Sequence, residues 1–319
     1  MKIVVLDGYA MNPGDLSWEG IERLGEFRLY ERTHKELIIE RIADAEIVLT
    51  NKVILSKEIL EKVPSVKYIG VMATGYNVVD IEAARQLGIV VTNVPAYSTG
   101  SVAQLVLAFI LEFCHHVGEH SRAVQGGTWT SSRDFTFWNY PLIELNGKTL
   151  GIIGYGAIGQ AVSKLAAAFG MNIKVYSRTE KTELETDKIK FTGFQQLLQE
   201  ADFISLHCPL TEETEALINT ESLSKIKTGA YLINTSRGPV IDEQAVADAL
   251  NSGKLAGAAV DVVSSEPIKA DNPLLGAKNC LITPHFAWAP LEARNRLMYT
   301  LLDNIEAYLK GKPINVVNK

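Results

Sequence analysis

Three segments in the second half of the chain each carry a side chain suited to proton transfer or anion binding. "INTSRGPVID" contains Arg237, "AAVDVVSSEPI" contains Glu266 and "LITPHFAWAP" contains His285. Each of these residues follows an apolar run that predicts a buried strand. Because ligands bind at the carboxyl ends of the strands in a doubly wound sheet, we expect the three groups to share one edge.

The three residue types complement one another chemically. An imidazole exchanges protons near neutral pH, and a neighbouring carboxylate stabilises its protonated form and selects its tautomer. A guanidinium binds a carboxylate through paired hydrogen bonds. A single His, Arg or Glu-Pro is more often structural, so the prediction depends on the combination. No acid or histidine stands at metal-ligand spacing from His285, and we expect no metal site.

The most specific local motif is "TLGIIGYGAIGQAV", in which Gly154, Gly156 and Gly159 form G-x-G-x-x-G. It lies between an apolar strand pattern and an alanine-rich helical pattern, which is the context that dinucleotide binding requires. The first glycine permits a tight turn, the second lets the backbone approach a pyrophosphate and the third lets helix and strand pack closely. The alternative is a glycine-rich turn without a ligand.

The end of the next predicted strand indicates which dinucleotide binds. An acid about 20 residues after the motif would hold the ribose of NAD, but the chain reads "KVYSRTE" there. Arg178, flanked by the hydroxyls of Ser177 and Thr179, suits the additional phosphate of NADP better. NADP is therefore favoured. NAD stays open, because Glu180 could reach the ribose and Arg178 could be an exposed loop cation.

Apolar runs and helical patterns alternate along the chain, which predicts an α/β protein with two doubly wound parallel-sheet domains divided near residue 100. A single long helix is predicted from Ser101, as its N-cap, to Gln125, followed by a polar, aromatic connecting arm over 126–148 and a C-terminal helix over 290–310. The predicted strands are 2–6, 46–50, 68–73, 89–94, 149–154, 173–177, 203–207, 230–235, 257–262 and 280–284.

The composition excludes several classes of protein. A formal net charge of −6 argues against a nucleic-acid surface. Cys114, Cys208 and Cys280 are widely separated, so neither a disulfide framework nor a zinc site is indicated. The longest apolar stretch, "VAQLVLAFILEF", is too short to span a membrane, and the N-terminus does not resemble a signal peptide. We therefore expect a cytoplasmic protein.

Over essentially its whole length the chain resembles the D-isomer-specific 2-hydroxyacid dehydrogenases. The resemblance rests on "GIIGYGAIGQAV", "ADFISLHCPLTEET", "GAYLINTSRGPVIDEQAVADAL", "GAAVDVVSSEP" and "NCLITPHFAW", in the order and spacing of that family. It implies a flavodoxin-like substrate domain of residues 1–99 plus 288–319 and an NAD(P)-binding Rossmann domain of residues 100–287.

The resemblance also implies roles for residues. Arg237 would bind the substrate, Glu266 would be the partner of the histidine, and His285 would be the general acid or base. Asp261 would face the nicotinamide end of the cofactor. The cofactor-binding residues expected in all are Gly154, Tyr155, Gly156, Ala157, Ile158, Gly159, Ser177, Arg178, Thr179, Cys208, Pro209, Thr214, Thr235, Ser236 and Asp261.

The segment "VMATGYNVVD" bears on the substrate. Backbone N–H groups of Ala73, Thr74 and Gly75 could cradle a carboxylate, the use to which the family puts this loop. "ATGYN" is most similar to the glycerate dehydrogenase (hydroxypyruvate reductase) branch, which points to hydroxypyruvate and D-glycerate, with glyoxylate as the alternative. Trp288 is expected to contact the substrate. Trp138 is a further candidate, reaching it from a partner subunit.

Two other functions are less favoured. Formate dehydrogenase resembles this chain but lacks the Glu–His pair, so Glu266 argues against it. A corepressor that senses dinucleotide is a binding protein of the same fold, and the presence of Arg237, Glu266 and His285 favours the enzyme over it. Members of the family typically form homodimers through the helix and arm that correspond to residues 101–148. The resemblance therefore implies a homodimer.

Overall fold

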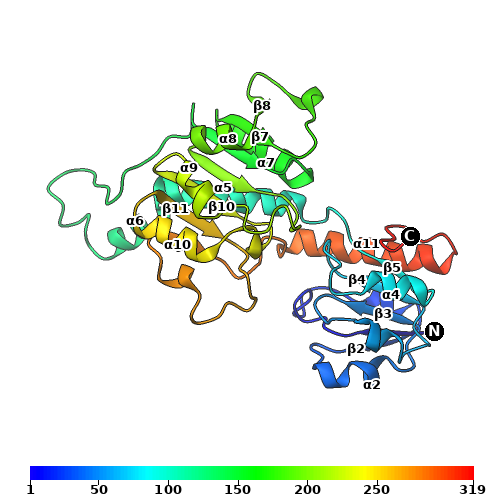
Figure 1. Ribbon diagram of the computed structural model, residues 1–319. Coiled ribbons are helices and arrows are strands. Elements are labelled where there is room, and N and C mark those ends of the chain that lie inside the picture. Colours follow the sequence, from blue (N-terminus) through cyan, green and yellow to red (C-terminus); the bar gives the residue numbers. More distant parts are fainter. The chain divides into compact units, whose positions relative to one another are not determined.

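The computed structural model describes residues 1–319, and its chain forms two compact units. Unit 1 consists of Met1–Ser98 and Trp288–Lys319, and unit 2 of Thr99–Ala287. Each unit contains its own parallel sheet, coloured blue to cyan in unit 1 and green to orange in unit 2 (Figure 1). The α/β fold with two parallel sheets is therefore as the sequence predicts.

The sheet of unit 1 has the strand order β2-β1-β3-β4-β5 and is parallel throughout. This is the flavodoxin-like order, with a switch point between β1 and β3. The strands are β1 (Lys2–Val5), β2 (Glu26–Leu29), β3 (Ile47–Thr50), β4 (Tyr68–Val71) and β5 (Val90–Thr92). The helices are α1 (Glu19–Glu22), η1 (Lys35–Leu37), α2 (Ile38–Ile42), α3 (Lys57–Leu60), α4 (Ile81–Gln86) and α11 (Leu291–Leu309).

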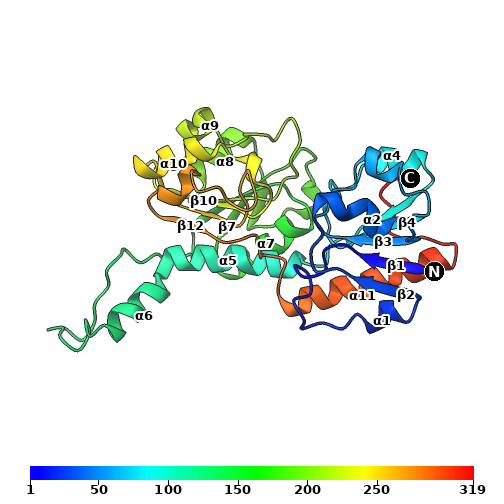
Figure 2. The ribbon, with the colours of Figure 1, turned by 90° about the horizontal axis from the view of Figure 1, so that it is seen from below.

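Apolar side chains cover both faces of this sheet. Helices α2, α3 and α4 contribute to the core on one face. The other face is covered by α1 and by α11, whose Leu297, Leu301 and Ile305 are fully buried. Figures 1 and 2 both show α11 (orange to red) lying along the sheet. The last helix of the chain therefore belongs to the core of the first unit.

The sheet of unit 2 has the order β12-β11-β10-β9-β6-β7-β8, again parallel. In chain order this is the Rossmann arrangement with one additional strand, and its switch point lies between β6 and β9. The strands are β6 (Thr149–Ile153), β7 (Asn172–Tyr176), β8 (Ile189–Phe191), β9 (Phe203–Leu206), β10 (Ala230–Asn234), β11 (Leu255–Val260) and β12 (Cys280–Ile282).

Helices again pack on both faces. One face is covered by α8, α9 and α10, and the other by α5 and α7. The helices of unit 2 are α5 (Thr99–His115), α6 (Val117–Gln125), α7 (Ala157–Ala168), η2 (Thr182–Leu184), α8 (Phe194–Glu200), α9 (Thr220–Lys225), η3 (Gly238–Val240), α10 (Glu243–Asn251) and η4 (Pro273–Gly276).

Three details of the sequence prediction are wrong. The helix expected over 101–125 begins earlier, at Thr99, and is two helices, because His116 adopts a left-handed conformation (φ 47°) between them. Strands β2 and β8 were not predicted; β2 is an exposed edge strand without the apolar run that identifies a buried one. Asp261 lies directly after β11 rather than inside it.

Helix α6 and the following segment 126–142 project away from the sheet of unit 2 (Figure 2). By length and composition, no single helix would cross a membrane, whereas α5 and α6 taken together would pass the same test as a pair bent by 51°. Seven side chains of α5, including Phe109 and Phe113, are buried in the core of unit 2.

Candidate active site

The glycine motif begins where β6 ends, at the switch point of the unit 2 sheet. Gly154 has a φ of +95°, a backbone conformation that residues other than glycine rarely adopt. A Cβ on Gly154 would lie 2.6 Å from the backbone nitrogen of Cys208, in the loop after β9. The first glycine therefore lets two adjacent βα loops touch through their backbones.

The other two glycines shape the start of α7. A Cβ on Gly159 would lie 2.3 Å from the carbonyl oxygen of Gly154, so the helix meets the loop closely there. Gly156 is the N-cap residue, has no side chain to cap the helix and faces open space. The first turn, which starts with Ala157 and Ile158, can therefore present its free N–H groups to a phosphate. Tyr155 is buried, and its hydroxyl is bonded to Ser163.

The residues expected near the ribose follow β7. The Arg178 side chain is 86% exposed, and its Nη1 lies 4.0 Å from Oε2 of Glu213. Ser177 is partly exposed and Thr179 is exposed. The guanidinium of Arg178 thus has free hydrogen-bond donors and stands beside two hydroxyl groups. Glu213 is a nearby acid that the sequence did not predict.

The loop after β9 is held by its own hydrogen bonds. The hydroxyl of Thr214 donates to the carbonyl oxygen of Pro209 (2.6 Å) and accepts from the N–H of Thr211 (2.8 Å). Burial raises the pKa of the Cys208 thiol, which therefore stays protonated. Burial also lowers the pKa of His207 to about 3, so its imidazole is neutral and shares a 2.9 Å hydrogen bond with Ser205.

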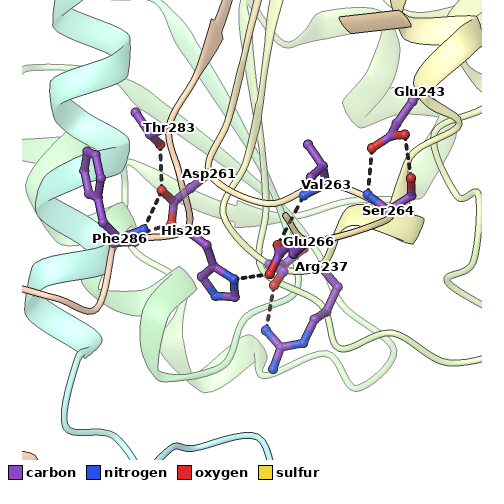
Figure 3. A network of polar contacts seen from close by, with 11 residues as sticks. Arg237, Glu243, Asp261, Val263, Ser264, Glu266, Thr283, His285 and Phe286 are labelled. Atoms are coloured by element: carbon purple, nitrogen blue, oxygen red, sulfur yellow. Dashed lines mark hydrogen bonds and ion pairs between the residues drawn. The ribbon is translucent and has the colours of Figure 1, made fainter. Parts of the chain in front are cut away.

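Glu266 and His285 form an ion pair or charge-assisted hydrogen bond in unit 2. The Nδ1 atom of His285 lies 2.6 Å from Oε2 of Glu266, and both side chains are partly exposed. Figure 3 shows the imidazole pointing toward the carboxylate, which also accepts from the N–H of Val263 through Oε1 (3.3 Å). Because Nδ1 is occupied by Glu266, the Nε2 atom is the ring nitrogen left for another partner.

Asp261 holds the loop that carries His285. Its carboxylate is almost fully buried and accepts from the hydroxyl of Thr283 (2.6 Å) and from the N–H groups of Phe286 (3.0 Å) and Ala287 (2.9 Å). Burial raises the pKa of Asp261, and these three hydrogen bonds oppose that rise. His285 itself has a φ of +52°, which is uncommon for residues other than glycine, and Asp261 fixes the two backbone N–H groups that follow it.

Arg237 follows β10 and is exposed. Its Nη1 donates to the carbonyl oxygen of Ser236 (2.7 Å), which leaves the other guanidinium donors free for an anion. The buried side chain of Asn234 holds this loop: Nδ2 donates to the carbonyl oxygen of Arg237, and Oδ1 accepts from the N–H and hydroxyl of Ser236. The Oγ1 atom of Thr235 is buried without a partner.

Close backbone packing brings the loops of Arg237 and Glu266 together. A Cβ on Gly238 would lie 2.0 Å from the carbonyl carbon of Val263, so only glycine fits there. Glu243, at the start of α10, accepts hydrogen bonds from the N–H and the hydroxyl of Ser264 (both 2.7 Å) (Figure 3). These bonds hold the loop that carries Glu266. The sequence analysis did not predict the supporting roles of Asn234 and Glu243. For Asn234, its position directly before "TSRG" could have indicated such a role.

In unit 1, the loop 73–75 follows β4. The carbonyl oxygen of Ala73 accepts from the N–H of Val94 (3.0 Å), and that of Thr74 accepts from Nδ2 of Asn93 (2.7 Å). The N–H groups of Thr74 and Gly75 have no partner within the chain. The loop therefore offers donors without acceptors, which suits an anion.

The two tryptophans differ in their surroundings. Trp288 is partly buried against the core of unit 1 that α11 covers. Trp138 lies in the projecting segment of unit 2 and is 62% exposed. The packing of Trp288 accounts for its position without a substrate, so its role in binding stays a prediction.

Comparisons with known proteins agree with this geometry. Residues 107–287 match the family described as D-isomer specific 2-hydroxyacid dehydrogenase, NAD binding domain. The chain is 55% identical over 322 residues to hydroxypyruvate reductase of Blautia hydrogenotrophica, and the match covers 100% of both proteins.

Two solved structures extend the similarity to the whole fold. One is an acyclic imino acid reductase in complex with NADPH and D-Arg (TM-score 0.86, 32% identity, 99% of this chain and 100% of that one). The other is D-lactate dehydrogenase of Aquifex aeolicus with NAD and lactic acid (TM-score 0.86, 30% identity, 100% and 99%). The open glycine loop, the uncapped helix α7 and the unpartnered hydroxyl of Thr235 fit a dinucleotide. The chain belongs to the D-isomer-specific 2-hydroxyacid dehydrogenases, oxidoreductases that act on the CH–OH group of small 2-hydroxy acids with a nicotinamide cofactor.

Proposed function

We propose that this enzyme reduces hydroxypyruvate to D-glycerate and that NADPH is its preferred coenzyme. The observation that carries the proposal is the 2.6 Å contact between Nδ1 of His285 and Oε2 of Glu266, which leaves Nε2 available for a substrate oxygen. The identity of 55% with a hydroxypyruvate reductase over the full length supports the choice of substrate.

His285 is the general acid of the reduction. The nicotinamide supplies the hydride when it is bound, and the substrate oxygen then needs a proton. Nε2 of the protonated His285 donates that proton, and the carboxylate of Glu266 stabilises the charged imidazole beforehand. In the oxidative direction the neutral His285 accepts the hydroxyl proton at the same nitrogen.

Arg237 binds and polarises the substrate. Its guanidinium has donors that the chain does not use, and a 2-oxo acid offers a carboxylate and a carbonyl oxygen as acceptors. Orienting these oxygens fixes the face of the carbonyl carbon that accepts hydride. The free N–H groups of the loop 73–75 bind the substrate carboxylate, and Trp288 contacts the remainder of the substrate.

The cofactor binds along the switch-point edge of the unit 2 sheet. The loop Gly154–Gly159 and the first turn of α7 hold the pyrophosphate. Ser177, Arg178 and Thr179 bind the 2′-phosphate of NADPH, and Arg178 is the residue that discriminates against NADH. Lining the rest of the dinucleotide are Cys208, Pro209, Thr214, Thr235, Ser236 and Asp261.

The protein forms a homodimer through the projecting segment of unit 2. Trp129, Phe135, Trp138 and Leu142 are all more than half exposed and are gathered in this one segment. Grouped exposed apolar side chains are typical of an interaction surface. In the dimer Trp138 contacts the partner's substrate. Light scattering behind size-exclusion chromatography measures the mass directly, and a monomer at micromolar concentration would contradict this assignment.

A substrate panel tests the proposed reaction. The ratio kcat/KM is measured for hydroxypyruvate, glyoxylate, pyruvate and longer 2-oxo acids with NADPH and with NADH. Hydroxypyruvate with NADPH should give the highest value. A higher value for glyoxylate would reassign the substrate, and one for NADH would reassign the coenzyme.

A further inference from the structure

The loop 73–75 is held from inside unit 1 by two buried asparagine side chains. Nδ2 of Asn51 donates to the carbonyl oxygen of Met72 (2.7 Å), and Nδ2 of Asn93 donates to that of Thr74 (2.7 Å). Asn51 is 5% exposed and Asn93 is 8% exposed. The carbonyl oxygen between them, that of Ala73, accepts from the N–H of Val94. Three consecutive carbonyl groups are therefore fixed.

Fixing a carbonyl group also fixes the neighbouring N–H group. A trans peptide unit is planar, and its C=O and N–H bonds point in opposite directions. The carbonyl of Thr74 and the N–H of Gly75 belong to one such unit, so the bond from Asn93 orients the N–H of Gly75 away from Asn93. By the same geometry, the bond from Val94 orients the N–H of Thr74. Both of these N–H groups lack a partner within the chain.

Asn93 is in turn held by residues from the other end of the chain. Nδ2 of Asn304, a fully buried residue in α11, donates to the backbone carbonyl of Asn93 (2.8 Å). Nδ2 of Asn315 donates to Oδ1 of Asn304 (2.8 Å), and the carbonyl oxygen of Asn315 accepts from the N–H of Asn93 (3.2 Å). A relay of three asparagines thus connects the C-terminal segment to Thr74.

We propose that Asn93, supported by Asn304, is a positioning residue for substrate binding: it aims the N–H of Gly75 at the substrate carboxylate. This rests on the proposed function, in which the loop 73–75 binds that carboxylate. Asn304, which is fully buried, has a partner at each end of its amide: the backbone carbonyl of Asn93 and Nδ2 of Asn315. Without the bond from Asn93, the Thr74–Gly75 peptide unit loses the contact that holds its orientation. The direction of the Gly75 N–H is then no longer fixed.

The test compares two substitutions, each of which removes an asparagine side-chain donor from unit 1. Asn93→Asp keeps the size of the side chain but replaces the donor to Thr74 with an acceptor. Asn318→Asp is the matched control, because Nδ2 of Asn318 donates to the carbonyl oxygen of Ile89 (2.8 Å) and Oδ1 accepts from the N–H of Val91 (3.0 Å). Asn318 thus anchors the same C-terminal segment without touching Asn93 or Thr74.

We expect Asn93→Asp to raise the KM for hydroxypyruvate about tenfold, with kcat changed less than about threefold. The KM for NADPH should stay unchanged, because unit 2 is not altered. Asn304→Asp, one step further from the loop, should raise the KM for hydroxypyruvate by a smaller factor and serves as the test if Asn93→Asp does not fold. Asn318→Asp should leave that KM unchanged.

Several results would overturn the proposal. An unchanged KM for hydroxypyruvate in a folded Asn93→Asp enzyme would contradict it. So would an equal rise in KM for Asn318→Asp, because the effect would then come from general loosening of unit 1. A wild-type enzyme that does not reduce 2-oxo acids would overturn the proposed function together with this inference, whereas an active wild type with unaffected variants overturns the inference alone.

Discussion

Oε2 of Glu266 lies 2.6 Å from Nδ1 of His285, although the two residues are 19 positions apart and follow different strands. Both loops are held by further bonds. Glu243 fixes the backbone of Ser264, two residues before Glu266, and Asp261 fixes the two residues that follow His285. The pair is therefore supported on each side by a carboxylate that makes several hydrogen bonds to backbone and hydroxyl groups.

Replacing His285 with Ala should lower kcat for hydroxypyruvate by about 10²–10⁴-fold, because proton transfer loses its donor. The affinity for NADPH should be nearly unchanged, which fluorescence titration of the nucleotide measures. Glu266→Gln, which keeps the shape of the partner but removes its charge, should give a smaller loss of kcat. Near-wild-type turnover by His285→Ala would exclude the histidine as the general acid.

Glu213 should oppose the binding of NADPH by Arg178. Its carboxylate lies 4.0 Å from Nη1 of Arg178, and both side chains are highly exposed. Glu213→Gln should raise the preference for NADPH over NADH, as the ratio of kcat/KM values, by about two- to fivefold at low salt. Arg178→Ala should lower the same ratio by about tenfold or more.

A double-mutant cycle separates these two effects. In the Arg178→Ala background, Glu213→Gln should have little effect on the coenzyme ratio, and Glu212→Gln is a neighbouring control for charge alone. If Arg178→Ala weakens NADPH and NADH equally, Arg178 does not contact the 2′-phosphate, and the assignment of coenzyme fails.

Substituting Gly238 with Ala should destabilise unit 2 and impair catalysis together. The new Cβ would lie 2.0 Å from the carbonyl carbon of Val263, so the loops of Arg237 and Glu266 must separate. We expect a loss of about 2–3 kcal/mol in the free energy of unfolding, measured with urea, and a lower kcat/KM. Gly276→Ala is the control, because a Cβ there meets nothing within 4 Å. Equal stability of the two variants would show that the loops give way freely.

The partly buried imidazole of His207 should make stability depend on pH. Burial lowers its pKa from an ordinary value of 6.5 to about 3, so between these values the unfolded chain binds a proton that the folded chain does not. This contribution to stability is complete above about pH 6.5 and is lost progressively as the pH falls toward 3. The difference in unfolding free energy between wild type and His207→Gln should therefore shrink as the pH falls.

His34, which is exposed, provides the control for that measurement. His34→Gln should leave the shape of the stability curve between pH 7 and pH 4 as it is in the wild type, because folding does not remove this side chain from water. If His207→Gln and wild type lose stability in parallel over this range, the imidazole of His207 is not kept neutral by folding.

The sequence by itself determined the features that depend on neighbouring residues. Buried parallel strands such as β3 and β4 are continuous apolar runs, and the turn around Gly154 needs a local backbone conformation that glycine supplies. Spacing and residue type were sufficient to single out Arg237, Glu266 and His285. Signals that extend over only a few residues are readable without coordinates.

The tertiary structure alone decided which distant groups meet. Nothing near Thr74 in the sequence indicates that Asn93 and Asn304 support it, or that Glu213 lies beside Arg178. The edge strand β2 and the break at His116 also escaped prediction, because an exposed strand lacks an apolar run and a left-handed residue other than glycine has no strong local signature. Hydrogen bonds between remote residues depend on how the chain closes on itself, and that is fixed only when the core packs.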